Sequence, residues 1–371
     1  MTSKIGGFDL VRGLSALLVM VGHLRSVLFL PYNKLKAPDH IDRVIYFITG
    51  YGHQCVMIFF VLSGYFVGGP FITNYHTSTL NSLLTKYTVN RLTRLWVVLV
   101  PALVLTLTLD FIGVRLSLIP TIYSDPNFFP YIHLTNDSKI ITLIGNLLFL
   151  QTTLVPTFGS DAPLWSLANE FWYYLLFPIM YLIINLPGQK IVTKLWLAFL
   201  ATIILLFLII FNSGLLIYFL IWLVGVVVYY FQSKLNMSRP VLVLSIVQFL
   251  ITMLLLRTIE STYGDFLLGI SSGIFLFAIL KIDLHPLLNT SSQFLSKISY
   301  TLYATHLPII IFIKAVIIQN TILDNSILSY CVFIVLTSFI IFLCYILYFL
   351  FERNTNSIRI YTMQNILKLK S

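Results

Sequence analysis

The stretch LVRGLSALLVMVGHL, residues 10–24, decides the fold class, because it is apolar enough to lie in lipid and yet contains Arg12 and His23. An ionisable side chain in a membrane costs roughly 3 kcal/mol on insertion scales, so such groups usually face the protein interior or a water-filled cavity. His23 follows Arg12 by eleven residues. At about 100° and 1.5 Å per residue, the two side chains lie within about 20° of each other and about 16 Å apart along a helix. We therefore expect one face of a membrane helix to carry both.

The composition around this stretch is that of an integral membrane protein. The chain has 371 residues, of which 58% are hydrophobic and 10% are charged, and its mean hydropathy is +0.93. Apolar runs near the length of a bilayer crossing recur along the chain and leave no room for a separate soluble domain. We expect a single membrane domain over residues 1–371 with a short cytosolic tail at about 352–371, and a first span that is not a cleaved signal peptide.

Hydropathy and charge predict an all-α bundle of about ten spans with both termini cytosolic. With this topology fourteen lysines and arginines lie on the inside and six on the outside, not counting Arg12, Arg25 and Lys314 within spans, as the positive-inside rule requires. A further segment at 140–155 is mostly apolar, but it is short and contains several polar residues. We therefore expect it to insert only partly. The expected spans are 8–30, 45–67, 91–112, 164–186, 193–212, 214–232, 239–257, 264–281, 298–318 and 328–351.

The net charge of +10 is explained by residues flanking these spans, so we expect no nucleic-acid partner. The three cysteines lie far apart without metal-ligand spacing, and we expect no metal site. We expect the lipid bilayer to surround the protein. Aromatic and proline residues in the external loop 113–163 suggest an ordered cap or a substrate-facing platform.

Intramembrane polar residues sort by depth in this topology. Five residues share the inner rim, namely Arg12, Ser63, Lys86, Arg91 and Arg94. Deeper or nearer the outside lie His23, His53, Trp165, Glu170, Tyr174 and His306. Each has a structural alternative: Arg91 and Arg94 as interfacial anchors, Arg12 paired with Asp9, Ser63 and His53 as packing residues, and Glu170 in an ion pair.

Together the two groups resemble a corridor across the membrane. Arginines bind phosphates through forked donors. A histidine whose proton affinity is adjusted by a carboxylate suits general-base or acyl-carrier chemistry. A cytosolic donor with phosphates and a long arm, such as coenzyme A, has the properties needed to reach from the inner rim to His23.

Five segments resemble, in order, the hallmarks of the membrane acyltransferase 3 family: FDLVRGLSALLVMVGHL, VMIFFVLSGYFVGG, NRLTRLWVVLVP, PLWSLANEFWYYLLFP and KISYTLYATHLPI. The resemblance extends from about residue 5 to the FERN sequence at 351–354. It implies an integral membrane O-acyltransferase that uses a cytosolic acyl-CoA, commonly acetyl-CoA, to acylate carbohydrate at the outer face, in a bacterial inner membrane. His53-Gln54-Cys55 departs from the small glycines found there in many relatives.

The resemblance also implies roles for the residues that match. His23 would act as base on a sugar hydroxyl or would accept the acyl group first. Glu170 would position His23 or adjust its proton affinity. The expected donor-binding residues are Arg12, Ser63, Lys86, Arg91 and Arg94, and the expected acceptor-binding residues are Trp165, Tyr174 and His306.

Two alternatives come from other functional classes. A transporter or flippase for polysaccharide or lipid-linked glycans would also have about ten spans and buried charges, but it would need no acyl-CoA site. An inactive partner of polysaccharide-assembly proteins would bind glycan without acyl transfer. For the acyltransferase itself, polysaccharide-assembly proteins are candidate partners.

Overall fold

We analysed a computed structural model, which describes residues 6–116, 123, 140–259, 261–282, 286–319 and 321–368. Within these ranges the regular elements are all helical. In the described part of the chain, nine helical stretches are long and apolar enough to cross a membrane. The predicted all-α membrane bundle is therefore confirmed. The predicted span at 239–257 corresponds to a shorter apolar helix, Arg239–Leu255.

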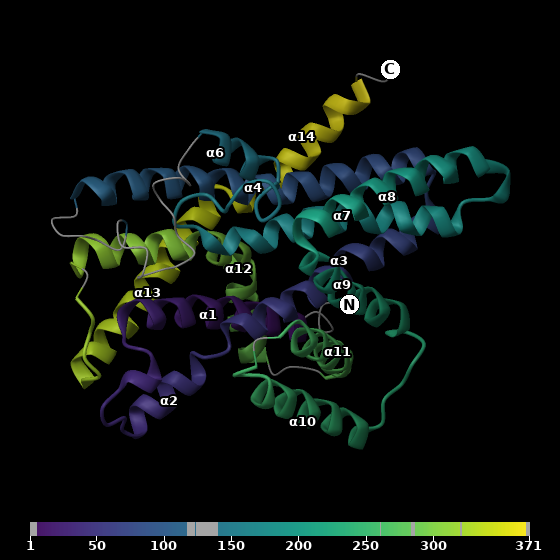
Figure 1. The fold of residues 1–371 in the computed structure, drawn as a ribbon. Coiled ribbons are helices and arrows are strands. Elements are labelled where there is room, and N and C mark those ends of the chain that lie inside the picture. Colours follow the sequence, from purple (N-terminus) through teal and green to yellow (C-terminus); the bar gives the residue numbers. More distant parts are fainter. Residues whose placement is uncertain are drawn as a thin grey trace.

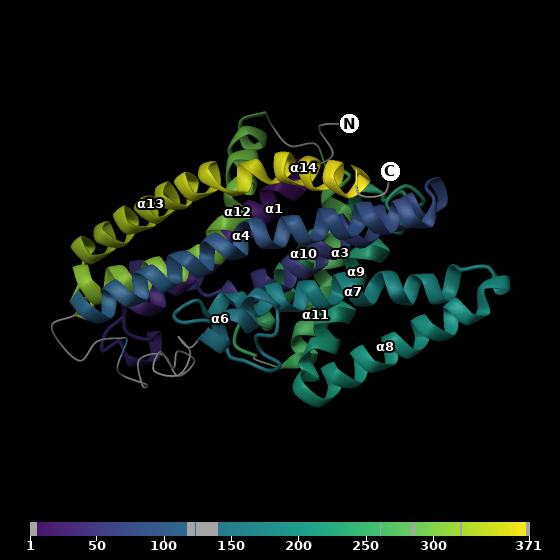
Figure 2. The same ribbon diagram turned by 90° about the horizontal axis from the view of Figure 1, so that it is seen from above.

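Figures 1 and 2 show the helices as a bundle in which the start of α1 and the end of α14 lie towards one end and α2 towards the other. The α-helices are α1 (Gly6–Leu28), α2 (His40–Ile48), α3 (Gly52–Thr77), α4 (Leu80–Leu116), α6 (Ile140–Leu147), α7 (Trp165–Asn185), α8 (Ile191–Asn212), α9 (Gly214–Phe231), α10 (Arg239–Leu255), α11 (Thr262–Ile279), α12 (Pro286–Phe312), α13 (Ile327–Leu350) and α14 (Thr355–Lys368).

Several helix bounds differ from the expected spans. The expected second span at 45–67 is divided, because α2 ends at Ile48 and α3 begins at Gly52. Helix α4 begins at Leu80, eleven residues before the expected start at 91. Its first three turns include polar residues such as Asn81 and Lys86, which a hydropathy criterion excludes although they are compatible with a helix that leaves the bilayer.

The ends of α12 and α13 also differ from expectation. Helix α12 continues through Pro308 and is followed by a π-helical turn, η5 (Ile313–Ile317). After α13 the chain does not continue as an irregular tail, because a 3-10 turn, η6 (Glu352–Asn354), leads directly into α14. Residues 355–368 are thus part of the helical architecture.

The segment expected to insert only partly contains α6, whose eight residues span about 12 Å and cannot cross a bilayer. Polar side chains of this segment form hydrogen bonds that hold the loop after α6 in place. The Asn146 amide donates to the Pro156 carbonyl oxygen (2.9 Å) and accepts from the Phe158 N–H (3.1 Å). Gln151 Nε2 donates to the Leu164 carbonyl oxygen (3.0 Å), at the start of α7. This part of the expected external platform is ordered, whereas 117–122 and 124–139 lie outside the described residues.

Close helix packing surrounds the middle of the bundle. Helix α1 packs against α12 and α3, and α3 packs against α9. A Cβ atom at Gly13 would lie 2.6 Å from Leu295 Cβ, so glycine is required where α1 crosses α12. A Cβ atom at Gly64 would lie 1.8 Å from the Trp222 carbonyl oxygen, which shows the same requirement between α3 and α9. Small residues allow this approach in membrane proteins.

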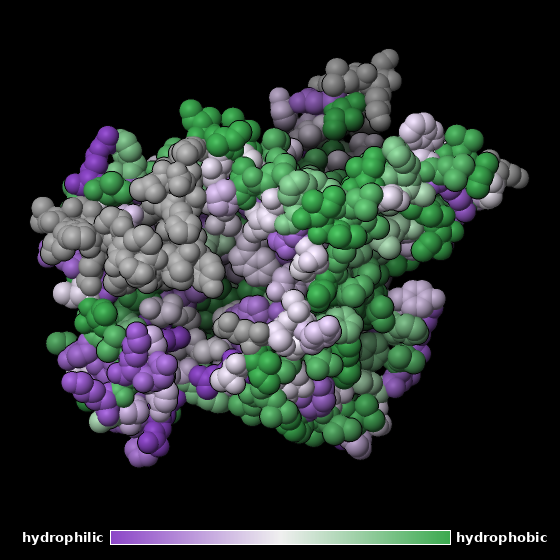
Figure 3. All heavy atoms as spheres, in the orientation of Figure 1, coloured by the Kyte–Doolittle hydropathy of each residue, from purple (hydrophilic) through white to green (hydrophobic). Residues whose placement is uncertain are grey.

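The molecular surface is that of a lipid-facing bundle. Figure 3 shows broad hydrophobic areas, with hydrophilic residues gathered where α2 lies in Figure 1. Helix α8 exposes large apolar side chains, including Trp196 (67%) and Phe199 (59%). Exposure of this extent is expected where lipid rather than water is the neighbour.

Candidate active site

A cavity of about 330 Å³, here called the cationic cavity, lies between α1, α3, α4, α7, α12 and α14. It is lined by four arginines and one carboxylate, so its formal charge is positive. The polar and aromatic lining residues used below are Arg12, Ser63, Arg91, Arg94, Glu170, Tyr174, Ser299, Tyr300, Tyr303, Thr355 and Arg359.

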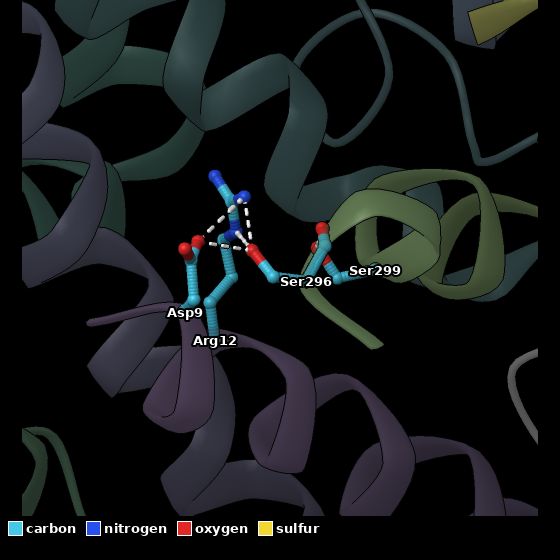
Figure 4. Close-up of polar contacts among 4 residues, drawn as sticks. All are labelled: Asp9, Arg12, Ser296 and Ser299. Carbon is cyan, nitrogen blue, oxygen red and sulfur yellow. Dashed lines mark hydrogen bonds and ion pairs between the residues drawn. The ribbon is translucent and has the colours of Figure 1, made fainter. Parts of the chain in front are cut away.

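Arg12 is held in position by neighbours on two helices. Its guanidinium pairs with Asp9 (3.4 Å), and its Nε donates to Ser296 Oγ (2.9 Å). Ser296 Oγ in turn donates to Asp9 Oδ1 (2.6 Å). Figure 4 shows this triangle joining α1 to α12, with Ser299 one turn further along α12. The pairing of Arg12 with Asp9, which was the structural alternative for this residue, is present, and Arg12 also lines the cationic cavity.

Arg91 and Arg94 lie one turn apart on α4. The Arg94 guanidinium carbon lies 5.2 Å from the centroid of the Tyr300 ring. Arg91 Nε and the Tyr300 hydroxyl are buried and have no hydrogen-bond partner in the described part of the chain. Unsatisfied buried donors are costly, so these two atoms are suited to an anionic ligand with several oxygen acceptors.

A hydrogen-bonded network on the α3 and α7 side of the cavity ends at Glu170. Trp222 Nε1 donates to Ser63 Oγ (3.1 Å), which lies 3.1 Å from Tyr174 Oη. Tyr174 Oη donates to Glu170 Oε2 (3.0 Å). The carboxylate is also attracted by Arg94 and Arg91. Glu170 therefore offsets part of the positive charge in this cavity.

A second cavity of about 170 Å³, here called the histidine cavity, is lined by His23, His53, Trp165 and Tyr303 among others. His53 Nε2 lies 2.7 Å from Asp265 Oδ1 on α11. Tyr218 Oη donates to the other carboxylate oxygen of Asp265 (3.2 Å). The histidine cavity thus holds one imidazole from α1 and a second that is oriented by a buried carboxylate.

A chain of hydrogen bonds determines the proton positions on His23. His306 Nδ1 lies 2.9 Å from the Leu302 carbonyl oxygen, and His306 Nε2 lies 2.8 Å from His23 Nδ1. A carbonyl oxygen can only accept, so we assign the His306 proton to Nδ1. For neutral rings, His306 Nε2 then accepts from His23 Nδ1. The lone pair of His23 is consequently on Nε2.

The two cavities adjoin and share part of their lining. Val56 and Tyr303 line both, and the Tyr303 hydroxyl accepts a hydrogen bond from Ser166 Oγ (2.8 Å). The Phe59 and Tyr303 rings meet edge to face with centroids 5.6 Å apart. In place of the expected single corridor, the structure thus has Arg12 and His23 in two adjoining cavities, with Val56 and Tyr303 at their junction.

Several other predicted site residues do not lie where we expected them. Glu170 and Tyr174 are among the described residues that line the cationic cavity and not among those that line the histidine cavity, so the structure places Glu170 with the arginines and not in the cavity of His23. His306 is completely buried behind His23. Lys86 is exposed and is not among the residues lining the cationic cavity.

Three residues were missed by sequence reasoning. Tyr303 precedes His306 by three residues and lies between the cavities, and the motif KISYTLYATHLPI already contained it. Asp265 is a carboxylate inside an apolar run, which is the signal that should have paired it with His53. Arg359 was counted only as a cytosolic charge, because it follows the last apolar run.

The site and fold define a class: a polytopic helical membrane protein with a cationic cavity next to a hydrogen-bonded histidine pair. The sequence profile of the acyltransferase 3 family, described as an acyltransferase domain, matches residues 5–349. The chain therefore belongs to this family of acyltransferases. No curated protein and no solved structure matches the chain.

Proposed function

We propose that this acyltransferase transfers an acetyl group, or another short acyl group, from cytosolic acyl-CoA to a hydroxyl of a cell-surface or lipid-linked glycan. The reaction would take place in a bacterial inner membrane, with the glycan on its outer side. The observation that carries the proposal is the arrangement of the two cavities. One is lined by four arginines, and the next is lined by His23, whose lone pair we assign to Nε2.

The cationic cavity fits the phosphates of such a donor. Arg91 Nε and Tyr300 Oη are buried donors without a partner among the described residues, and Arg12 is already oriented by Asp9 and Ser296. Phosphates accept bidentate hydrogen bonds from guanidinium groups. We assign donor binding to Arg12, Arg91 and Arg94, with Ser63 supporting Tyr174 and Glu170. Lys86 has no place in this scheme.

The histidine cavity fits the acceptor. Trp165 offers an aromatic surface, and His23 and His53 offer polar atoms in the same cavity. His23 Nε2 would take the proton of the acceptor hydroxyl as its oxygen forms the new ester bond. The bound donor supplies an acyl thioester, whose carbon–sulfur bond breaks. His23 would return the proton, which leaves with the thiol. His306 keeps the His23 ring in the required tautomer.

Tyr303 lines both cavities, so the donor arm would pass beside this side chain, from the cationic side, to meet the acceptor. Closing this position while no acceptor is bound would protect the thioester from water. Cleavage without a glycan acceptor should therefore be slow.

The test is acyl transfer by the purified chain in liposomes with radiolabelled acetyl-CoA and a glycan acceptor. His23→Ala should reduce transfer by about 100-fold or more, whereas membrane insertion and acetyl-CoA binding should be retained. Arg91→Ala should weaken acetyl-CoA binding in detergent. Transfer at the normal rate by a correctly inserted His23→Ala variant would refute the role of His23. Absence of acetyl-CoA binding by the unmodified chain would refute acetyl-CoA as the donor. Mass spectrometry of surface glycans with and without the gene would identify the acceptor.

A further inference from the structure

Helix α14 contributes to the cationic cavity although it lies beyond the matched family region, which ends at residue 349. It packs against α4, the helix that carries Arg91 and Arg94. Figure 1 shows that α14 begins close to α4 and that its C-terminal part projects away from the bundle. Thr355 and Arg359 line the cavity, and their spacing of four residues places them on one helical face.

The beginning of α14 is fixed to the core of the bundle. Glu352 of η6 is buried and accepts from the Thr301 N–H (3.2 Å) and from Thr301 Oγ1 (2.6 Å) on α12. Thr355 Oγ1 then donates to the Glu352 carbonyl oxygen (2.5 Å). These bonds connect α14 to the helix that carries Tyr300 and Tyr303. The position of Arg359 is therefore set by the core and not by a free tail.

Arg359 adds a fourth guanidinium to a cavity that already has Arg12, Arg91 and Arg94. Glu170 is the single carboxylate among the described lining residues, and Asp9 and Glu352 act on Arg12 and Arg94 from outside the lining, so the four guanidinium groups still exceed the carboxylates. Like charges in one partly buried cavity repel each other, and an anion with more than one charge removes this repulsion. Arg359 itself is hydrogen-bonded to Asn356 one turn earlier, which directs the guanidinium without neutralising it.

We propose that α14 is part of the donor site and that Arg359 binds a phosphate of the nucleotide end of the acyl donor. This inference rests on the proposed function. It makes the C-terminal helix a determinant of donor specificity: Arg359 favours a phosphorylated donor over an acyl thioester that lacks the nucleotide.

The experiment compares two donors with the full-length chain in phosphatidylcholine liposomes. Acetyl-CoA carries the nucleotide phosphates, whereas S-acetylpantetheine has the same thioester and arm without them. Arg359→Ala should raise KM for acetyl-CoA about tenfold, the size expected for one charge-assisted contact, without lowering kcat. KM for S-acetylpantetheine should stay unchanged. Arg359→Lys, which keeps the charge, should show a smaller rise.

Arg353→Ala is the matched control. Arg353 belongs to η6, is exposed, lies 4.6 Å from the Phe349 ring centroid and is not among the described lining residues. Its removal should leave KM for both donors unchanged. Thermal unfolding of each variant in the same liposomes or detergent shows whether α14 is still docked.

Three results would overturn the inference. These are an unchanged KM of Arg359→Ala for acetyl-CoA, an equal loss with both donors, and an effect seen only when phosphatidylglycerol replaces phosphatidylcholine. The last result would assign Arg359 to a lipid headgroup. Failure of the proposed function is separately visible, because the unmodified chain would then transfer acetyl from neither donor.

Discussion

The hydrogen bonds from Leu302 through His306 to His23 determine which nitrogen of His23 is available to a substrate. His306 has no exposed surface, so it cannot contact a substrate without rearrangement. Its effect must pass through His23. This makes His306 a positioning residue, although the sequence analysis assigned it to acceptor binding.

At the residue scale, we predict that His306→Leu lowers kcat about 10- to 100-fold, because the His23 ring is then free to rotate or change tautomer. KM for acetyl-CoA should stay unchanged, since the donor arginines are not altered. His306→Gln, whose side-chain oxygen can accept from His23 Nδ1, should recover part of the rate. Steady-state kinetics of both variants check this. Equal kcat values for the Leu and Gln variants would contradict the positioning role.

Sequence reasoning identified some of these residues but not the residues that they contact. Arg12 and His23 are predictable, because charge in an apolar run is itself the signal, and their common face follows from spacing. The His23–His306 and Ser63–Tyr174 contacts join residues 283 and 111 positions apart. Such contacts depend on the rotation and depth of separate helices. Those quantities are set by packing, which hydropathy does not encode.

At the element scale, glycines set the distance between α3 and α9. A Cβ atom at Gly64 would lie 1.8 Å from the Trp222 carbonyl oxygen, and one at Gly225 would lie 1.8 Å from the Val61 carbonyl oxygen. Backbone atoms cannot yield as flexible side chains do. The two helices must therefore separate if either glycine gains a side chain, and the Trp222–Ser63 hydrogen bond of the cationic cavity would be lengthened.

We predict that Gly64→Ala destabilises the protein by about 1–3 kcal/mol, the range for overpacking in a closely packed interior. Thermal unfolding in detergent should show a lower midpoint temperature. Gly188→Ala is the control, because no heavy atom would lie within 4 Å of its Cβ atom. Equal midpoints for the two variants would show that α3 and α9 are not held at this distance.

The loop before α7 contains a buried carboxylate that makes its stability depend on pH. Asp161 has no exposed surface. Burial, reinforced by the charge of Asp110, raises the pKa of Asp161 well above its usual value of 3.8, while the Thr106 hydroxyl lowers it in part. The folded protein therefore favours the protonated carboxyl.

We predict that Asp161→Asn becomes more stable relative to the unmodified protein as pH rises from 4 to 8. When the folded-state pKa is the higher one, the protonated carboxyl contributes fully to stability below the unfolded pKa. This contribution is lost as pH rises towards the folded pKa, by at most about 1.4 kcal/mol per pH unit. Asparagine does not titrate in this range. Midpoint temperatures of both proteins across the pH series test this, and a constant difference would contradict it.

The existence of most membrane helices could be read from apolar runs, but their ends could not. The first turns of α4 and the whole of α14 are polar enough to be excluded by hydropathy, yet each packs on a neighbour. The break between α2 and α3 falls at Thr49-Gly50-Tyr51, where Thr49 and Tyr51 have non-helical backbone angles. Glycine favours such a break, but the averaged hydropathy of the 45–67 stretch does not reveal it.

For the whole molecule, the two ends of the bundle have different chemistry. The turn between α7 and α8 lies at the same end as the start of α1, and α2 lies at the opposite end (Figures 1 and 2). The positive-inside rule assigns the first of these ends to the cytosol, because most of the lysines and arginines outside the spans lie on that side of the predicted topology. The cationic cavity, with α14 on its wall, would then be reached from the cytosol.

This orientation can be measured with single cysteines in a variant where the exposed Cys331 is replaced by serine. Lys36→Cys lies between η2 (Tyr32–Lys34) and α2, and Lys190→Cys lies in η4 (Gly188–Lys190); both positions are exposed. In intact expressing cells, a membrane-impermeant maleimide should label Lys36→Cys and should label Lys190→Cys only after permeabilisation. The reverse pattern would place the arginines on the outside. A cytosolic acyl-CoA could then not reach them, so the donor assignment would fail together with the orientation.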